Sequence, residues 1–168
     1  MAQVYISHVE EDRELAFQLA AILESAGMSA WLYERDSVPG PSYLLQTGKA
    51  IEEAQAFALI LSKHSLGSHQ VGREVVRAHE SNKPFVPLLF GIEHADFQRR
   101  QPEWREAVGA ATALDVPQEG LGSVRERIIA GFMALGLTPA NARSPDSPGA
   151  IPPRSSSLPA PAVQSRCR

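Results

Sequence analysis

The sequence lacks several features that whole classes of protein require. Its single cysteine, Cys167, stands next to the last residue, so no internal disulfide can form and a cysteine nucleophile is not expected. No apolar run is long enough to cross a membrane. The charged residues Glu10, Glu11 and Asp12 interrupt the first short apolar run, which argues against a signal peptide. We therefore expect a cytoplasmic protein without a membrane partner.

A strong charge of one sign is also missing. The chain has 16 Lys and Arg against 19 Asp and Glu, a formal net charge of −3. Proteins that bind nucleic acid usually carry a basic field, so we expect no nucleic-acid partner. The five histidines show no close metal-binding spacing such as HxxxH, so we expect no metal site.

Several nucleotide-binding and hydrolase signatures are absent as well. No GxGxxG follows an apolar run, and neither a P-loop nor a GxSxG elbow occurs. A Rossmann dinucleotide site, a P-loop site and a serine hydrolase triad are therefore unsupported, and we expect no prosthetic group.

Composition divides the chain into two parts. Residues 1–137 mix apolar and charged residues in periodic patterns, and their length suits one domain. Residues 138–168 are rich in Pro, Ser, Ala and Arg and show no apolar periodicity, so we predict a disordered tail or linker. A tail without a further role and a linker to a sensor domain both fit this composition.

Short apolar runs alternate with longer amphipathic ones in the first part. We predict strands and helices in turn, the strands at 4–7, 29–33, 56–62, 85–90 and 112–116, the helices near 12–26, 44–54, 70–82 and 124–136. The stretch 34–43, which contains Pro and Gly, is predicted to be a loop, and 91–111 to hold a short helix around Trp104. This alternation predicts an α/β, flavodoxin-like three-layer fold: a five-stranded parallel sheet of order 2-1-3-4-5 with helices on both faces.

The predicted strand order locates a ligand cleft. In such a sheet, ligands bind beyond the carboxyl ends of the strands, where the strand order reverses. That point lies between the first and third strands and is flanked by the loops 7–12 and 62–70. The second loop leads directly into the helix that carries Glu74, so Glu74 lies at the rim of the expected cleft.

The helical spacing around Glu74 predicts how exposed it is. Val71 and Val75 belong to the apolar stripe, and Glu74 lies about 60° from Val71 on the helical wheel. We therefore expect a half-shielded carboxylate whose truncation costs about 1 kcal/mol of stability or less. Such a group could stabilise a developing positive charge, or it could be a surface charge that is either solvated or paired with Arg73 or Arg77. Periodicity leaves both interpretations open.

Four segments, taken in order, resemble the TIR (Toll/interleukin-1 receptor) domain family, and their spacing is similar to that of its bacterial members. "VYISHVEEDRELAFQLAAILESAG" resembles the family's opening strand, acidic loop and helix. "DSVPG" (36–40) resembles its BB loop, "ALILSKHSLGSHQVGREV" its third strand and following helix, and "KPFVPLLF" its fourth strand. In the third segment Ser62, Ser68 and Glu74 fit the family pattern. The resemblance covers about residues 3–136.

The resemblance carries an expected activity. Many members of the family cleave the bond between nicotinamide and ribose, so it implies NAD+ as the substrate and ADP-ribose or a cyclic isomer as the product. It also implies that Glu74 is the catalytic carboxylate, which would stabilise an oxocarbenium-like ribose. The implied substrate-binding residues come from the first loop, the BB loop (36–43) and the helix of Glu74: Ser7, His8, Val9, Val38, Gly40 and Gln70.

Gln70 departs from the family pattern, because many active members carry Trp there. Tyr5, Trp31, Tyr33 and Tyr43 are candidates for an aromatic wall in its place, or for ordinary core and loop packing.

Three functions are therefore carried forward. The first is an NAD+ glycohydrolase or cyclase, acting in bacterial antiphage defence or as an effector, that self-associates through the BB loop. The second is a catalytically silent TIR–TIR interaction module, for which Gln70 would mark the lost activity. The third is a nucleoside deoxyribosyltransferase-like enzyme on a related sheet, which also uses a carboxylate against ribose.

Overall fold

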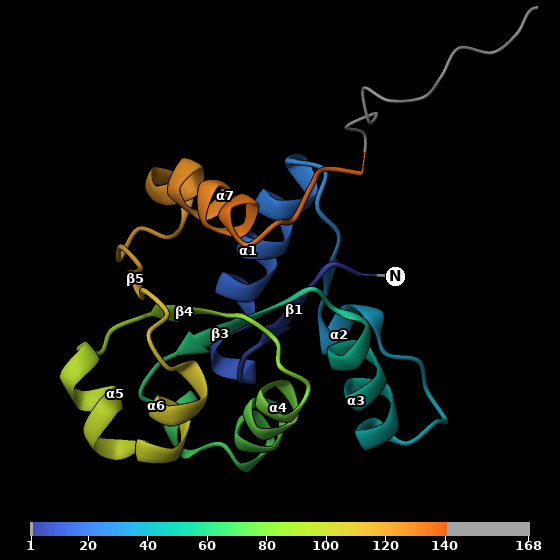
Figure 1. Ribbon diagram of the computed structural model, residues 1–168, viewed down its shortest axis with the longest axis horizontal. Helices are drawn as coiled ribbons and strands as arrows, with labels where there is room; N and C mark the ends of the chain where they lie inside the picture. Colours follow the sequence, from blue (N-terminus) through green and yellow to red (C-terminus); the bar gives the residue numbers. More distant parts are fainter. Residues whose placement is uncertain (1, 141–168) are drawn as a thin grey trace, which may run out of the picture.

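The computed structural model describes residues 2–140 of the chain (Figure 1). The strands are β1 (Val4–Ser7), β2 (Ala30–Trp31), β3 (Ala56–Leu61), β4 (Phe85–Leu89) and β5 (Leu114–Asp115). The α-helices are α1 (Arg13–Ser25), α2 (Tyr33–Asp36), α3 (Tyr43–Glu53), α4 (His69–Glu80), α5 (His94–Arg100), α6 (Pro102–Val108) and α7 (Arg125–Ala134). The short 3-10 helices are η1 (Glu10–Asp12), η2 (Ser65–Gly67) and η3 (Gly122–Val124). The predicted tail from residue 141 onward, with Cys167, lies outside the described residues.

All the strands run parallel, in the order β2-β1-β3-β4-β5, which confirms the predicted flavodoxin-like fold. β3 is the central strand, and every one of its residues is buried, as expected for an apolar run covered on both faces. Ser7, at the end of β1, pairs in register with Leu59 of β3. The carboxyl ends of β1 and β3 therefore meet at one edge, where the strand order reverses.

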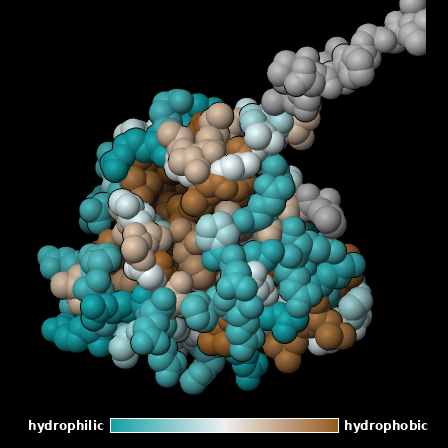
Figure 2. Space-filling model, in the orientation of Figure 1, coloured by the Kyte–Doolittle hydropathy of each residue, from teal (hydrophilic) through white to brown (hydrophobic). Residues whose placement is uncertain are grey.

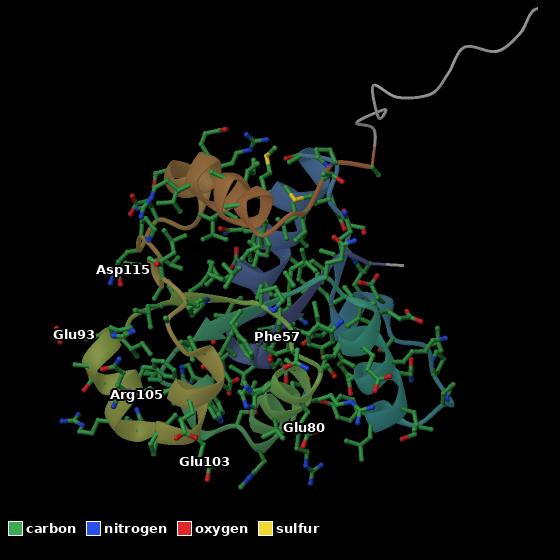
Figure 3. The ribbon with its side chains drawn as sticks, viewed as in Figure 1. Phe57, Glu80, Glu93, Glu103, Arg105 and Asp115 are labelled. Carbon is green, nitrogen blue, oxygen red and sulfur yellow. The ribbon has the colours of Figure 1, made fainter. Side chains whose placement is uncertain are left out.

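The helices form one layer on each face of the sheet (Figure 1). α1 and α7 cover one face and enclose a core that includes Leu19. α3, α4 and α6 cover the other face and enclose a second core that includes Phe57, which lies between the sheet and α4 (Figure 3). The charged residues Glu80 and Glu103 lie on the outer side of the same layer (Figure 3). This second layer, with α3 and α4, is the one that holds the candidate site.

The region after β2 differs from the prediction. We expected a strand over 29–33 and a loop over 34–43, but β2 is shorter and a one-turn helix, α2, covers Tyr33–Asp36. The turn forms because the Asp36 carboxylate accepts a hydrogen bond from the Leu32 backbone N–H at 2.8 Å. Such local side-chain to backbone bonds compete with strand pairing.

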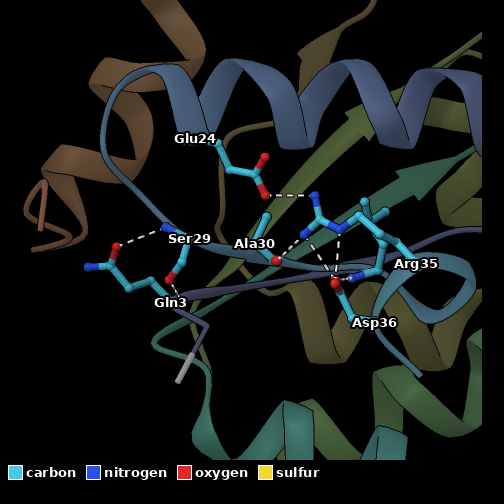
Figure 4. A network of polar contacts seen from close by, with 7 residues as sticks. Gln3, Glu24, Ser29, Ala30, Arg35 and Asp36 are labelled. Carbon is cyan, nitrogen blue, oxygen red and sulfur yellow. Dashed lines mark hydrogen bonds and ion pairs between the residues drawn. The ribbon is translucent and has the colours of Figure 1, made fainter. Parts of the chain in front are cut away.

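Arg35 fixes α2 against the rest of the fold (Figure 4). Its guanidinium donates to the Glu24 carboxylate of α1 at 2.6 Å and to the Ala30 carbonyl of β2 at 2.6 Å. It also donates to the Asp36 carboxylate at 2.9 Å. The one-turn helix is therefore anchored to both its neighbours at the carboxyl end of β2.

The stretch 91–111 holds two short helices, α5 and α6, where one around Trp104 was predicted. Pro102 stands at the start of α6, a position where a missing N–H costs nothing. Each helix buries few residues, among them Phe97 and Trp104, so its apolar period is too short to be read from the sequence. Within the described residues, the helices are too short or too polar to cross a bilayer.

Candidate functional site

Glu74 lies at the carboxyl edge of the sheet, in contact with the end of β1. Ser68 caps α4, since its side chain accepts the Val71 N–H at 3.2 Å. The helix then carries Glu74 to Ser7, the last residue of β1. The Ser7 hydroxyl donates to Glu74 Oε2 at 2.5 Å, and both side chains are buried. A residue of the first loop and a residue of α4 thus meet where the strand order predicts a cleft.

Glu74 is far less exposed than its helical position suggested. It is 4% exposed, so the expectation of a half-shielded carboxylate is wrong, and the small stability cost inferred from it loses its basis. Val71 and Val75 press α4 onto the sheet, and Tyr43 of α3 closes the flank beside Glu74. A helical wheel describes one helix only, so it could not predict that Tyr43 of α3 covers Glu74 of α4.

The second carboxylate oxygen has two donors of its own. Glu74 Oε1 accepts the Tyr43 hydroxyl at 3.0 Å and Gln70 Nε2 at 3.4 Å. The neighbouring arginines do not reach it: Arg77 forms an ion pair with α3, and Arg73 makes no hydrogen bond to Glu74 in the described part of the chain. The interpretation of Glu74 as a surface charge paired with arginine is therefore wrong.

Burial controls the protonation of this carboxyl. It raises the pKa of Glu74 above its usual value of 4.5, while hydrogen bonds act in the opposite direction, from Ser7, Tyr5, Tyr43 and Gln70. Burial, aided by the charge of Glu74, also raises the pKa of Tyr43, so the Tyr43 hydroxyl keeps its proton and remains a donor. The site therefore holds a desolvated acid whose charged form depends on fixed donors.

Two of the four aromatic candidates, Tyr33 and Tyr43, place a ring beside the site. Tyr33 and Tyr43 meet edge to face, with ring centroids 4.9 Å apart, and Tyr43 reaches Glu74 as described. The rings of Tyr5 and Trp31 instead stack on each other at 5.1 Å and pack in or against the core between the sheet and α3 and α4, so Tyr5 reaches Glu74 through its hydroxyl only. The aromatic surface available beside Gln70 therefore comes from Tyr33 and Tyr43.

A cavity of about 570 Å³, here called the β1 cavity, opens beside the loop that follows β1. It is bounded by that loop, by α2, by the turn after β3 and by the start of α4, and its lining includes His8, Val9, Tyr33, Glu34, Ser68 and Gln70. Its volume is in the range of small-molecule sites.

A second cavity, here called the α3–α4 cavity, has a volume of about 600 Å³ and lies between those two helices. Tyr43 and Glu74 line it together with Arg73. Because Gln70 of the β1 cavity donates to Glu74 of the α3–α4 cavity, the carboxylate stands between the two. A ligand in the α3–α4 cavity would lie next to the carboxylate, and one in the β1 cavity would reach it by displacing Gln70.

The structure brings most of the predicted substrate-binding residues together. Ser7 and Gln70 both contact Glu74, while His8 and Val9 line the β1 cavity. The His8 side chain is almost fully enclosed, because its Nε2 lies 2.8 Å from Glu34 Oε2 and its Nδ1 lies 3.2 Å from the Ile6 carbonyl. Its polar atoms therefore face protein groups.

Val38 and Gly40 of the BB loop lie apart from this group and line neither cavity. Val38 is 56% exposed. Its backbone is held by Gln46 of α3, whose side chain accepts the Val38 N–H at 2.7 Å and donates to its carbonyl at 3.0 Å. Gly40 has φ +104°, which disfavours any residue with a side chain. Within a single chain, the BB loop projects outward from the site.

A model of the TIR domain family matches residues 4–116, more than half of the chain. The chain belongs to the TIR domain family. The family predicted from four sequence segments is thereby confirmed. A comparison with curated proteins gives no match.

Solved structures share the fold of this TIR domain. The TIR domain of the Toll-related receptor TRR-2 from Hydra magnipapillata aligns with TM-score 0.62 and 21% identity, over 82% of this chain and 100% of that one. A metazoan TIR-STING receptor from C. gigas, in complex with 2',3'-cGAMP, aligns with TM-score 0.61 and 23% identity over 76% of this chain, which spans only 38% of the receptor. The Clostridium botulinum CMP N-glycosidase BcmB aligns with TM-score 0.53 and 15% identity, over 76% of this chain and 98% of that one. At these identities the likeness concerns the fold.

Two residues of the TIR site were missed or misjudged from the sequence. Tyr43 was considered only as an aromatic wall, although it begins the helix after the BB loop and donates to Glu74. Glu34 was not singled out, although it follows the carboxyl end of β2 and reaches His8. The rule that ligands bind beyond the carboxyl ends of strands would have selected it. No group of three or more potential metal ligands occurs among residues 2–140.

Proposed function

We propose that this TIR domain hydrolyses NAD+ at the bond between nicotinamide and ribose. Water enters, and nicotinamide, ADP-ribose and a proton leave; where a group of the ADP-ribose itself replaces water, the product is a cyclic isomer. The observation that supports this most is the buried Glu74 carboxylate, held by Ser7 and Tyr43 between two cavities. A fixed negative charge in a site of low dielectric suits an oxocarbenium-like transition state.

The reaction needs a carboxylate more than a general acid. Nicotinamide is cationic in NAD+ and departs neutral, so the leaving group takes up no proton, and we propose NAD+ as a substrate with no prosthetic group. The ribose hydroxyls would donate to Glu74 in place of one of its present partners. Gln70 Nε2, at 3.4 Å, is its longest hydrogen bond and the one that a ligand displaces at the lowest cost.

We propose that the domain also self-associates through the BB loop and the start of α3. Val38, Leu44 and Leu45 are 56%, 54% and 73% exposed, and apolar surface gathers over this end of α3 (Figure 2). Contiguous exposed apolar residues are typical of interaction surfaces. Because Leu44 and Leu45 also line the α3–α4 cavity, a neighbouring chain bound there would lie next to Glu74.

The experiment that tests the activity is a nicotinamide-release assay on the full chain, free and clustered on a support. We expect nicotinamide to appear in step with loss of NAD+, and faster per protein molecule when the chains are clustered. CMP and nucleosides are assayed beside NAD+. Release of the base from one of them, without release of nicotinamide from NAD+, would favour an N-glycosidase that acts on another substrate class. If clustered, folded protein leaves all of these substrates intact, the enzymatic proposal fails.

The second candidate is an interaction module without catalysis. It is favoured by the saturation of both Glu74 oxygens within the chain and by Gln70 at a position where many active TIR domains have Trp. Under this candidate, clustering would change association but never release nicotinamide. In either case the resemblance supports a role in bacterial antiphage defence or as a cytoplasmic effector, with a sensor domain or protein as a further partner.

A further inference from the structure

Glu34 has features of a ligand-binding carboxylate that the proposed reaction does not yet use. It follows the carboxyl end of β2, on the one-turn helix α2, and lines the β1 cavity. One oxygen, Oε2, is 2.8 Å from His8 Nε2, while the other makes no hydrogen bond with the described residues. Its side chain keeps 28% exposure, against 2% for His8. One half of this carboxylate is fixed, and the other half is free to accept a hydrogen bond.

His8 defines which oxygen is fixed. The two nitrogens of its enclosed ring face two acceptors, the Ile6 carbonyl and the Glu34 carboxyl. A neutral imidazole has one N–H, and the tautomer that carries it on Nε2 donates to Glu34 Oε2. This hydrogen bond holds Glu34 Oε2 against His8 and leaves the second oxygen, on a side chain that lines the cavity, available to a ligand.

The backbone beneath Glu34 is held equally firmly. The next residue, Arg35, is bonded to Glu24 and to the Ala30 carbonyl, and Asp36 closes the turn onto Leu32 (Figure 4). A carboxylate with a fixed backbone and one fixed oxygen loses little entropy when it binds. This arrangement suits recognition of a particular donor group.

The neighbours of Glu34 indicate the class of ligand. Tyr33 lines the same cavity and meets Tyr43, the partner of Glu74, edge to face. Gln70 also lines this cavity and donates to Glu74. A planar base next to Tyr33 would therefore lie beside the ribose that Glu74 is proposed to contact.

We propose that Glu34 recognises the exocyclic –NH2 group of the base that is cleaved from ribose, accepting its N–H on the oxygen that His8 leaves free. The inference rests on the proposed function for the identity of the reacting bond, but its chemistry applies to any base with such a group. The nicotinamide carboxamide and the 4-amino group of cytosine both qualify. Glu34 is a specificity determinant, and His8 is the residue that positions it.

The test measures binding, so that it does not depend on turnover. In the full chain carrying Glu74→Gln, dissociation constants are measured by calorimetry for NAD+ and for its 3-acetylpyridine analogue, in which a methyl group replaces –NH2. Because hydrogen bonds to charged groups are the strong ones, we expect NAD+ to bind about tenfold more tightly than the analogue.

Adding Glu34→Gln should remove that preference. The amide oxygen of the new glutamine would accept the hydrogen bond from His8, so the amide –NH2 would face the cavity. There it would meet the –NH2 of the ligand, and two donors cannot form a hydrogen bond. We therefore expect the ratio of the two dissociation constants to fall to about one or to invert. Glu10→Gln is the matched control: it removes the same charge from the lining of the same cavity, and we expect the ratio to be unchanged. His8→Gln leaves Glu34 in place but removes the group that positions it. We therefore expect this variant to weaken the preference for NAD+ over the analogue.

The outcomes separate this inference from the proposed function. An –NH2 preference that depends on Glu34, in a protein that never releases nicotinamide, leaves the recognition intact and refutes only the hydrolysis. If NAD+ does not bind, CMP and UMP are compared in the same way, since UMP lacks the amino group. Equal binding within both pairs of ligands, or a preference that survives Glu34→Gln in a protein of unchanged thermal melt, overturns the inference.

Discussion

Two buried serine–carboxylate pairs lie at the same edge of the sheet. Ser7, which ends β1, donates to Glu74 on the helix that follows β3. Ser62, directly after β3, donates to Asp12, which precedes the helix that follows β1. Both donor–acceptor distances are 2.5 Å, and all of these side chains are buried. Together the pairs join the two loops that flank the point of strand reversal.

The partners of the two carboxylates distinguish them. Ser62 also accepts two backbone N–H groups of the turn that follows it, at 3.2 Å each, so Asp12 completes a network that fixes the chain. Glu74 instead takes its other donors from the side chains of Tyr43 and Gln70 and stands between two cavities of about 570 and 600 Å³, while Asp12 borders one of about 280 Å³. Asp12 and Glu74 are both buried, and both accept a short hydrogen bond from a serine. Of the two, Glu74 is the one with further side-chain donors that a ligand could replace.

The largest effect on stability should come from Asp12. In Asp12→Ala the Ser62 hydroxyl loses its acceptor and the turn after β3 loses its anchor, which should lower the free energy of unfolding by about 1–3 kcal/mol. Urea denaturation measures this, with Glu11→Ala as the control because Glu11 is exposed next to it. Equal denaturation midpoints for the two variants would show that the Ser62–Asp12 pair is not structural.

Tyr43→Phe should affect Glu74, and it should lower the rate of nicotinamide release more than the stability of the fold. Without the hydroxyl, Glu74 loses a donor to its charged form, and we expect nicotinamide release to fall about tenfold. The acid side of the pH–rate profile should also move to higher pH, because that donor lowers the pKa of Glu74. Tyr33→Phe is the control, since it keeps the ring and removes no donor to Glu74. Equal losses in both variants would assign the effect to aromatic packing.

Leu45→Glu should weaken the proposed self-association. Leu45 is 73% exposed, so a charge there leaves the fold unchanged, and we expect activity in dilute solution to drop about fivefold and to recover on forced clustering. Gly40→Pro should also lower the activity in dilute solution, because the backbone angle of Gly40, φ +104°, is not available to proline. Met133→Glu, on the opposite layer and 50% exposed, is the control. Activity strictly proportional to the concentration of a monomeric protein would contradict the assembly.

The smallest expected effect is on the pH dependence of stability. Because the pKa of Glu74 is raised above 4.5 in the folded state, the folded protein holds that proton more tightly than the unfolded chain. Stability should therefore fall as pH rises from 4.5 through the folded pKa, and stay level above it. Glu74→Gln should lack this slope. Thermal melts of both proteins over this pH range test the sign, and identical slopes would show that Glu74 is not desolvated.

The sequence was sufficient for the topology because the longer strands and helices each carry a recognisable apolar period. β3 is apolar throughout, and Gly27 ends α1 with φ +81°. Strand order and family resemblance both select Glu74, near the start of α4, and its catalytic role stays a prediction. The positions of these elements relative to the sheet edge follow from chain connectivity alone.

The burial and hydrogen bonding of the site depend on contacts between different helices and strands. The apolar period of any one helix or strand does not predict such contacts. The burial of Glu74 is completed by Tyr43 of α3, and the position of Glu34 depends on the turn that Asp36 closes. Proline and glycine at 39–41 correctly predicted irregular backbone there but gave no sign of the helix just before it. Strand order therefore placed Glu74 at the sheet edge, while its hydrogen-bond partners are seen only in the three-dimensional structure.

We propose that Glu74 is catalytic and that Asp12, the other buried carboxylate of this edge, is structural. The most direct measurement is nicotinamide release from NAD+ by clustered wild type, Glu74→Gln and Asp12→Asn, at equal amounts of folded protein. We predict a loss of about a hundredfold or more for Glu74→Gln and a change of at most about threefold for Asp12→Asn. Near-normal turnover by Glu74→Gln, or a comparable loss in both variants, would show that Glu74 is not the catalytic carboxylate.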